Sequence, residues 1–210
     1  MRHLLLHAQA WWDAQRFDQP VWQVAEWHDQ KVRHIQLHIA KALGKVVAAL
    51  GEATATASGT DPMVRVRDEV LPDVAIYRSQ LLNTFPDCCL APGALYRSRI
   101  SVTVRSATAL PPERVPRAEL LWRVVLLLSR ASAALAAYLE PREHGTGSSA
   151  VRIGEAIQDL HDSAVALAAH FAIDLTRAHQ ARLEALLGAA LPVSLLEAGG
   201  LQDLFSATEH

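Results

Sequence analysis

Long segments rich in Leu and Ala, separated by turn-forming loops, constrain the fold of this sequence more than any other feature. Straight-chain residues and alanine favour the α-helix, and few aromatic or β-branched clusters compete with them. Half of the 210 residues are hydrophobic and a fifth are charged, so the chain can bury a core without disulfides or metals. The sequence predicts an all-α protein, a helical bundle of five or six helices.

Caps and breakers set the expected helix boundaries. Helices are expected at residues 4–16, from 21 to Gly51, from Pro62 to Phe85, at 117–139, at 151–171 and at 175–187. Pro72 lies inside the third of these segments, where a proline should kink the helix or mark a restart one residue earlier. The loops TATASGTDP (54–62) and EPREHGTGSS (140–149) contain small and turn-forming residues.

The region between Pro86 and Pro116 is expected to be irregular. Ile100, Val102 and Val104 alternate with Ser101 and Thr103, which indicates either a short strand or an extended linker. The expected organisation is therefore an N-terminal helix (1–20), a first helical half (21–86), a linker (87–116), a second helical half (117–190) and a C-terminal tail (191–210).

Charge and composition exclude several classes of function. A formal net charge of −2 gives no reason to expect nucleic acid as a partner. No uninterrupted apolar run is long enough to span a bilayer, so no membrane contact is expected. Cys88 and Cys89 are adjacent and cannot easily bond to each other, and so they imply no disulfide framework. We expect a cytoplasmic protein.

Two pairs of carboxylates stand at helical i, i+4 spacing. Glu69 and Asp73 form one pair in EVLPD, and Glu155 and Asp159 form the other in EAIQD. The two pairs are 86 residues apart (155 − 69 = 86), and each follows a long helix and a turn-rich loop, which indicates an internal duplication. Such a pair directs two carboxylates the same way and could bind Mg²⁺ or Mn²⁺; an exposed, solvated helix face shows the same spacing.

The segment WQVAEWHDQKVRHIQLHIAKALGKVVAALGEA, followed by a loop and VRDEVLPDVAIYRSQLLN, resembles the MazG-like all-α nucleoside triphosphate pyrophosphatases. FAIDLTRAHQARL (171–183) is similar to the family's GIDL-type helix. The resemblance covers roughly residues 22–83 and, more faintly, 118–187. It implies Mg²⁺ bound by an EExxE motif and an ExxD motif, with cleavage of a nucleoside triphosphate to monophosphate and pyrophosphate. It also implies two related halves packed as an internal pseudo-dimer, because family members usually assemble from four-helix units.

The sequence departs from that family where the acids of the first motif should stand. Lys41 and Lys45 occupy those places, and the matching helix of the second half has no acid before Glu140. Two ammonium groups beside Glu69 and Asp73 would make a poor Mg²⁺ site, because lysine already supplies the positive charge. The lysines could pair with these carboxylates in place of the metal, extend into solvent, or receive a phosphate.

Other side chains support weaker hypotheses. His34 and His38 lie one helical turn apart, a spacing that suits Zn²⁺ or a related transition metal and equally a polar or packed face. Trp22 and Trp27 are core or interface anchors, or they stack on a nucleotide base.

Three hypotheses for function follow. The first is a degenerate MazG-like protein without pyrophosphatase activity, which binds a nucleotide or phosphate or acts as an interaction module. The second is an active, Mg²⁺-dependent pyrophosphohydrolase that uses Glu52, Glu69, Asp73 and acids of the second half. The third is a structural, partner-binding helical protein. Mg²⁺ is expected as a cofactor only if the protein is an active enzyme, and a homo-oligomer is possible in each case.

Overall fold

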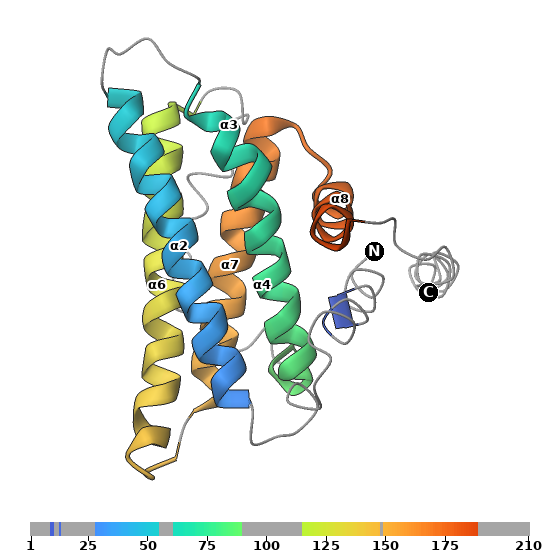
Figure 1. Ribbon diagram of the computed structural model, residues 1–210. Helices are drawn as coiled ribbons and strands as arrows, with labels where there is room; N and C mark the ends of the chain where they lie inside the picture. The colour runs from blue at the N-terminus through green and yellow to red at the C-terminus, as the bar shows by residue number, and fades with distance from the viewer. Residues whose placement is uncertain are drawn as a thin grey trace, which may run out of the picture.

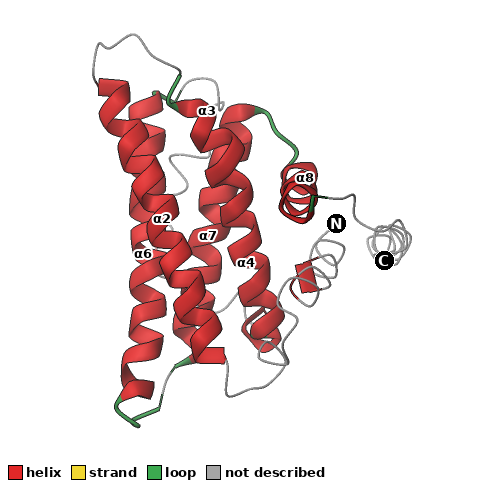
Figure 2. Ribbon diagram, viewed as in Figure 1, coloured by secondary structure: helices red, strands yellow, loops and turns green. Residues whose placement is uncertain are grey.

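A computed structural model describes Gln9, Ala10, Asp13 and residues 28–54, 61–89, 115–147 and 149–188. Within these ranges every regular element is a helix, which confirms the predicted all-α class (Figures 1 and 2). The elements are α2 (His28–Thr54), α3 (Met63–Arg65), the π-helix η3 (Val66–Val70), α4 (Leu71–Thr84), the 3₁₀ helix η4 (Pro86–Cys89), α6 (Arg117–Glu143), α7 (Ala150–Phe171) and α8 (Leu175–Leu187).

Four long helices form an antiparallel bundle. α2 packs against α6, α6 against α7, α7 against α4, and α4 with its π-turn against α2, so the four close into a ring (Figure 1). Arg142 near the end of α6 binds Asp29 at the start of α2 at 2.6 Å, which shows that these two neighbours are antiparallel. α8 packs outside the ring, chiefly against α4.

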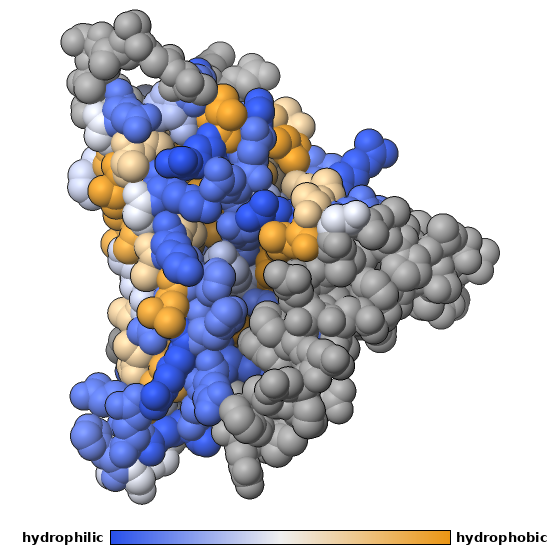
Figure 3. All heavy atoms as spheres, in the orientation of Figure 1, coloured by the Kyte–Doolittle hydropathy of each residue, from blue (hydrophilic) through white to orange (hydrophobic). Residues whose placement is uncertain are grey.

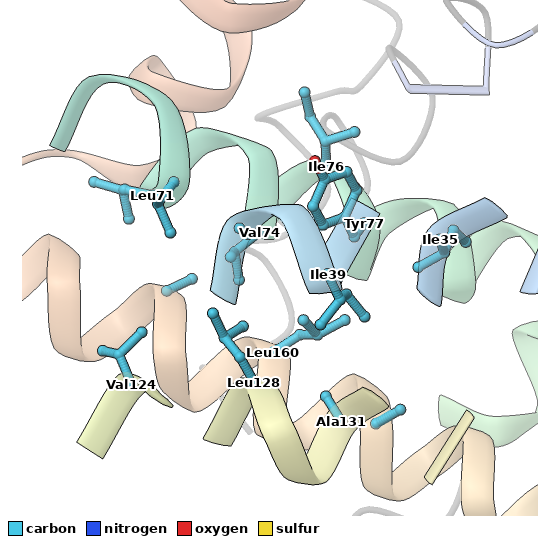
Figure 4. Packing of buried hydrophobic residues seen from close by; sticks show 14 of the residues in the cluster. Ile35, Ile39, Leu71, Val74, Ile76, Tyr77, Val124, Leu128, Ala131 and Leu160 are labelled. Atoms are coloured by element: carbon cyan, nitrogen blue, oxygen red, sulfur yellow. The ribbon is translucent and has the colours of Figure 1, made fainter. Parts of the chain in front are cut away.

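The interior of the bundle is aliphatic. Ile35 and Ile39 of α2, Leu71 and Val74 of α4, Val124, Leu128 and Ala131 of α6, and Leu160 of α7 are all fully buried, and their side chains meet between the helices in Figure 4. The buried residues of α2 recur at three- and four-residue steps (32, 35, 39, 42, 46, 49), the spacing of an amphipathic helix with one face in the core.

The predicted helix boundaries hold well in the second half of the chain. α7 and α8 match the expected ranges to within one residue. The start of α8 is fixed by Asp174, whose side chain accepts hydrogen bonds from the Thr176 and Arg177 amides at 2.8 and 3.1 Å. Two expected ends were wrong: α2 continues through Gly51 to Thr54, and α6 continues past 139 to Glu143. Glycine is only mildly unfavourable within a helix, and Pro141 lies in the last turn of α6.

The disturbance around Pro72 takes the form of a π-helical turn. Residues 66–70 widen to π geometry and regular α-helix resumes at Leu71, one residue before the proline, as predicted. Proline has no amide hydrogen and its ring crowds the carbonyl four residues earlier; a wider turn relieves that conflict without breaking the helix. The continuous α3–η3–α4 segment therefore keeps Glu69 and Asp73 on one helical rod.

Several predictions lie outside the described residues. These are most of the helix at 4–16, the start of the helix at 21, the strand or linker at 100–104, and the tail after 190. The division of the domains and the packing of two related halves as an internal pseudo-dimer remain predictions.

α6 is the single helix in the described ranges that is long and apolar enough to cross a membrane by length and composition, with 44% of its most apolar stretch buried inside the protein. The sequence analysis expected no membrane-spanning segment because it counted only uninterrupted apolar runs, whereas α6 reaches this length as one continuous helix. Core helices of soluble proteins meet the same criterion, and α6 packs against both α2 and α7.

Gly44 offers a direct test of the α2 helix. It lies mid-helix, and a Cβ added there would meet no atom within 4 Å. Gly44→Ala should therefore raise the free energy of unfolding by about 0.5–1 kcal/mol, since alanine loses less backbone entropy. Urea denaturation measures this change. Gly188→Ala is the opposite control. Gly188 has a φ of +68°, which alanine adopts only with strain, so this substitution should lower the free energy of unfolding. An equal increase in the free energy of unfolding for both variants would contradict the argument.

Candidate functional site

Lys45 lies between the two carboxylates of the first pair. Its Nζ is 2.7 Å from Glu69 Oε2 and 3.7 Å from Asp73 Oδ2. The i, i+4 spacing places both acids on the face of the η3–α4 rod that is turned toward α2, and Lys45 reaches them from α2. The structure thus brings together three of the residues singled out in the sequence, with the ammonium group bridging both acids. A polar band follows this side of the molecule between α2 and α4 (Figure 3).

Two arginines that the sequence analysis did not single out complete this cluster. Arg182 of α8 donates from Nε to Asp73 Oδ1 at 2.8 Å, and Arg65 Nε lies 3.7 Å from Glu69 Oε1. Three cationic side chains therefore surround two carboxylates. Asp73 is largely buried, with 11% of its side chain exposed, whereas 39% of Glu69 is exposed.

The electrostatics of the cluster favour the ionised form of Glu69. The hydrogen bond from Lys45 holds the pKa of Glu69 below its usual value, and the charges of Lys45 and Arg65 act in the same direction. Because the carboxylates are already neutralised by ammonium and guanidinium groups, a divalent cation would have to displace Lys45.

The rings of His34 and His38 lie in contact, tilted by 47°, beside the same cluster. Their ring centroids are 4.4 Å apart, and the Tyr77 hydroxyl lies 3.4 Å from Nδ1 of His38. Burial lowers the pKa of both imidazoles, and the charge of Lys41 lowers it further. Burial and the Asp73 charge raise the pKa of Tyr77 above its ordinary value. At neutral pH the pair is uncharged and packs against an un-ionised phenol.

The surroundings of Lys41 differ from those of Lys45. Lys41 is exposed and forms no ion pair within the described part of the chain, so of the three alternatives for the lysines the structure shows pairing for Lys45 and an exposed side chain for Lys41. Glu52 is also exposed. Trp22 and Trp27 lie outside the described residues. Among the described side chains, no group of three or more His, Cys, Asp or Glu is placed to hold a metal ion.

The second carboxylate pair has its own cationic partners. Nη2 of Arg130 on α6 lies 3.2 Å from Asp159 Oδ1, and the Asp159 side chain is 2% exposed. Arg152 binds Glu155 at 2.9 Å within the same helix, and both side chains are partly exposed. Each half thus binds the second acid of its pair to a base on the preceding long helix, Lys45 for Asp73 and Arg130 for Asp159.

A separate polar network joins Gln9 and Asp13 to the bundle. Gln9 and Gln80 donate to Asp13 Oδ1 at 2.8 and 2.9 Å, and His179 Nε2 lies 2.9 Å from Gln9 Oε1. Burial raises the pKa of Asp13 to about 6 and lowers that of His179 to about 4. No sequence pattern indicated this network, because its members come from segments up to 170 residues apart.

Comparisons with known proteins give no further assignment: no protein-family model, no curated protein and no solved structure matches this chain. Chemically, the cluster around Lys45 can balance the charge of two carboxylates and fix α4 to α2 and α8, and Lys41 exposes a further positive charge one turn away on α2. In the described residues it contains no acid that is free of a cationic partner.

Proposed function

We propose that this chain is a degenerate MazG-like protein in which Lys45 takes the place of a metal ion, and that it acts without pyrophosphatase activity as a nucleotide- or phosphate-binding or interaction module. The observation that carries the proposal is the position of Lys45 Nζ, in contact with both Glu69 and Asp73. In the family that the sequence resembles, those acids would hold Mg²⁺.

The second half of the chain supports the same reading. Asp159 follows Asp73 by 86 residues (159 − 73 = 86), and Arg130 follows Lys45 by 85 (130 − 45 = 85), with the same type of ion pair in each case. A duplicated unit that replaced its metal ligands with a base in both copies accounts for this correspondence. Two tandem units would form the pseudo-dimer that the resemblance implies.

The ligand class follows from the charges at the cluster. Lys45, Arg65 and Arg182 outnumber Glu69 and Asp73, and the exposed Lys41 lies one turn from Lys45 on α2. Guanidinium and ammonium groups bind phosphate by charge-assisted hydrogen bonds. A nucleotide or pyrophosphate bound there would need no Mg²⁺. We propose a cytoplasmic location, where a half-buried thiol such as that of Cys88 would stay reduced.

Lys45→Glu tests the replacement directly. The substitution removes the cation and adds a third carboxylate, the type of ligand that Mg²⁺ and Mn²⁺ prefer. We expect Mn²⁺ to raise the melting temperature of the variant by several degrees and to leave that of the wild-type protein unchanged. If the variant is unfolded without metal, recovery of helical circular dichroism on addition of Mn²⁺ gives the same answer.

Lys41→Glu is the matched control, because it makes the same charge change one turn away on an exposed side chain. A metal response from both variants, or from the wild-type protein, would contradict the replacement. The wild-type protein should release no pyrophosphate from the common nucleoside triphosphates with Mg²⁺, and should bind pyrophosphate more weakly after Lys41→Ala. Mg²⁺-dependent turnover would establish the active-enzyme alternative, and absence of pyrophosphate binding would leave only the interaction module.

A further inference from the structure

A pocket of about 310 Å³ opens at the end of the bundle where three helical segments begin or end. Its walls come from the start of the α3–η3–α4 segment, the first residue of α6 and the last two residues of α7, and Figure 1 shows these three ends together. Small-molecule sites in proteins start at about this volume. Lys45 and the charged side chains around it do not line the pocket.

The pocket and the Lys45 cluster lie on different faces of the α3–η3–α4 segment. Positions 63, 64 and 67 line the pocket, and steps of three and four residues place side chains on one helical face. Arg65 instead contacts Glu69 at 3.7 Å, on the face that is turned toward Lys45. The pocket is therefore a separate site, whose ligand need not be that of the Lys45 cluster.

Two arginines in the pocket keep hydrogen-bond donors for a ligand. Arg117 is 60% exposed and reaches Asp61 through Nη1 at 3.4 Å, and no other described residue accepts from its guanidinium. Arg67 donates to its neighbour Asp68 from Nε and Nη2 at 2.6 and 2.9 Å, which leaves Nη1. Exposed ion pairs of this kind contribute little stability, so an anionic ligand can compete with them at small cost.

His170 carries a polar atom without a partner. Its Nδ1 is buried and makes no hydrogen bond in the described part of the chain, and a buried polar atom of this kind marks a place where a ligand group or a water is expected. Burial and the charge of Arg117 lower the pKa of this imidazole, so near neutral pH it is uncharged and has one N–H to donate. Phe171, whose ring centroid lies 5.1 Å from that of His170, adds an apolar wall.

The charge balance of the pocket favours an anion. Its lining has the two positive charges of Arg67 and Arg117 and the one negative charge of Asp61, whose Oδ1 already accepts from the Met63 amide at 3.0 Å. α6 begins at Arg117, and the preceding Pro116 has no side-chain hydrogen bond that caps the helix. The positive end of the α6 dipole therefore adds to the attraction.

We propose that this pocket binds a phosphate monoester that carries a small aromatic or apolar group, with Arg67 and Arg117 on the phosphate and Phe171 beside the organic group. Such a phosphate carries about −1.5 to −2 charges near pH 7 and has three acceptor oxygens. It can engage two guanidinium groups from different helices, whereas one guanidinium fork satisfies a planar carboxylate. The proposal is independent of the proposed function, because it uses none of the residues around Lys45.

Titration of the full chain with phenyl phosphate, followed by phosphorus nuclear magnetic resonance, tests this proposal. The wild-type protein should bind the probe with a submillimolar dissociation constant, and Arg117→Gln should weaken binding roughly tenfold, the loss expected for a charge-assisted hydrogen bond. Arg67→Gln should have a similar effect and serves as the second variant if Arg117→Gln alters the fold. Arg152→Gln is the matched control. Arg152 is an exposed arginine in an exposed ion pair with Glu155, at the other end of α7, so its substitution should leave the affinity unchanged.

The ligand class has its own controls. Inorganic phosphate should bind more weakly than phenyl phosphate because it leaves the Phe171 wall uncovered, and benzoate should not displace the probe. Displacement by an equal concentration of benzoate would overturn the assignment to phosphate in favour of a carboxylate. Absence of any shift of the probe resonance would exclude the site.

The same titration of Lys45→Glu separates this pocket from the Lys45 cluster. That variant should retain the affinity of the wild-type protein for phenyl phosphate, whatever its response to Mn²⁺. Loss of binding in Lys45→Glu, together with unchanged binding in Arg117→Gln and Arg67→Gln, would move the ligand to the Lys45 cluster and overturn the proposal.

Discussion

Replacing Arg130 with alanine should lower the free energy of unfolding by about 3 kcal/mol. The substitution removes the guanidinium that lies 3.2 Å from Asp159 Oδ1, and Asp159 is 2% exposed. A carboxylate left in the interior without its ion-pair partner costs more than the pair contributes when intact, typically about 3–5 kcal/mol. Part of the Arg130 side chain is exposed, which puts the expected loss at the lower end. Urea denaturation with a constant m-value measures it.

Lys45→Ala provides the comparison from the first half of the chain. Its two acids are more exposed than Asp159, and after the substitution Asp73 keeps Arg182 at 2.8 Å while Glu69 keeps Arg65. The loss should therefore be about 1 kcal/mol or less, as for partly exposed ion pairs. The double variant Arg130→Leu/Asp159→Leu should recover most of the stability, because it removes the buried charge as well. Equal losses for Arg130→Ala and Lys45→Ala would show that burial does not set the cost.

The fold could be predicted because its signals are local. The limits of α7 and α8 follow from a capping aspartate, a turn-rich loop and helical periodicity, each contained within a few residues. The restart at Leu71 follows from the covalent geometry of Pro72. Gly51 and Pro141 misled the prediction because packing against neighbouring helices outweighs a cost of about 1 kcal/mol for glycine within a helix.

The site was predictable only where one helical stripe faces another. Lys41 and Lys45 are four residues apart on one helix, and Glu69 and Asp73 are four apart on another. Pairing a lysine with these acids needed only the assumption that the two helices are neighbours. Arg182 reaches Asp73 from 109 residues away, on a helix packed outside the bundle. That contact depends on where α8 docks on α4, and nothing local to residue 182 encodes it.

The N-terminal network should make two opposite contributions to the pH dependence of stability. Burial raises the pKa of Asp13 from 3.8 to about 6, against the weaker effects of its hydrogen bonds from Gln80 and Gln9 and the charge of Lys31. The folded state therefore binds this proton more tightly than the unfolded state. Its contribution to stability increases as the pH falls through about 6 and is complete below 3.8.

His179 acts in the other direction. Burial, and secondarily the charge of Arg78, lowers its pKa from 6.5 to about 4. Between these two values the unfolded chain binds the proton and the folded chain does not, so stability is lost as the pH falls from about 6.5 to 4. Each shift exceeds two pKa units, or about 3 kcal/mol at 1.36 kcal/mol per unit. The two contributions oppose each other over nearly the same pH range.

Single substitutions should separate these contributions. Asp13→Asn keeps an acceptor for Gln9 and Gln80 but cannot ionise, so the variant should lose about 2–3 kcal/mol relative to the wild-type protein between pH 6 and 4. His179→Gln keeps a donor for Gln9 and should gain a similar amount over the same interval. The difference in stability between each variant and the wild-type protein cancels the effect of every other titrating group.

Urea denaturation at half-unit pH intervals measures both differences. Parallel curves of stability against pH for all three proteins would mean that neither side chain is buried in the folded state. Curves that diverge in the expected directions would mean that Asp13, bonded to Gln80 of α4, and His179 of α8, linked through Gln9, are both buried and uncharged near pH 5.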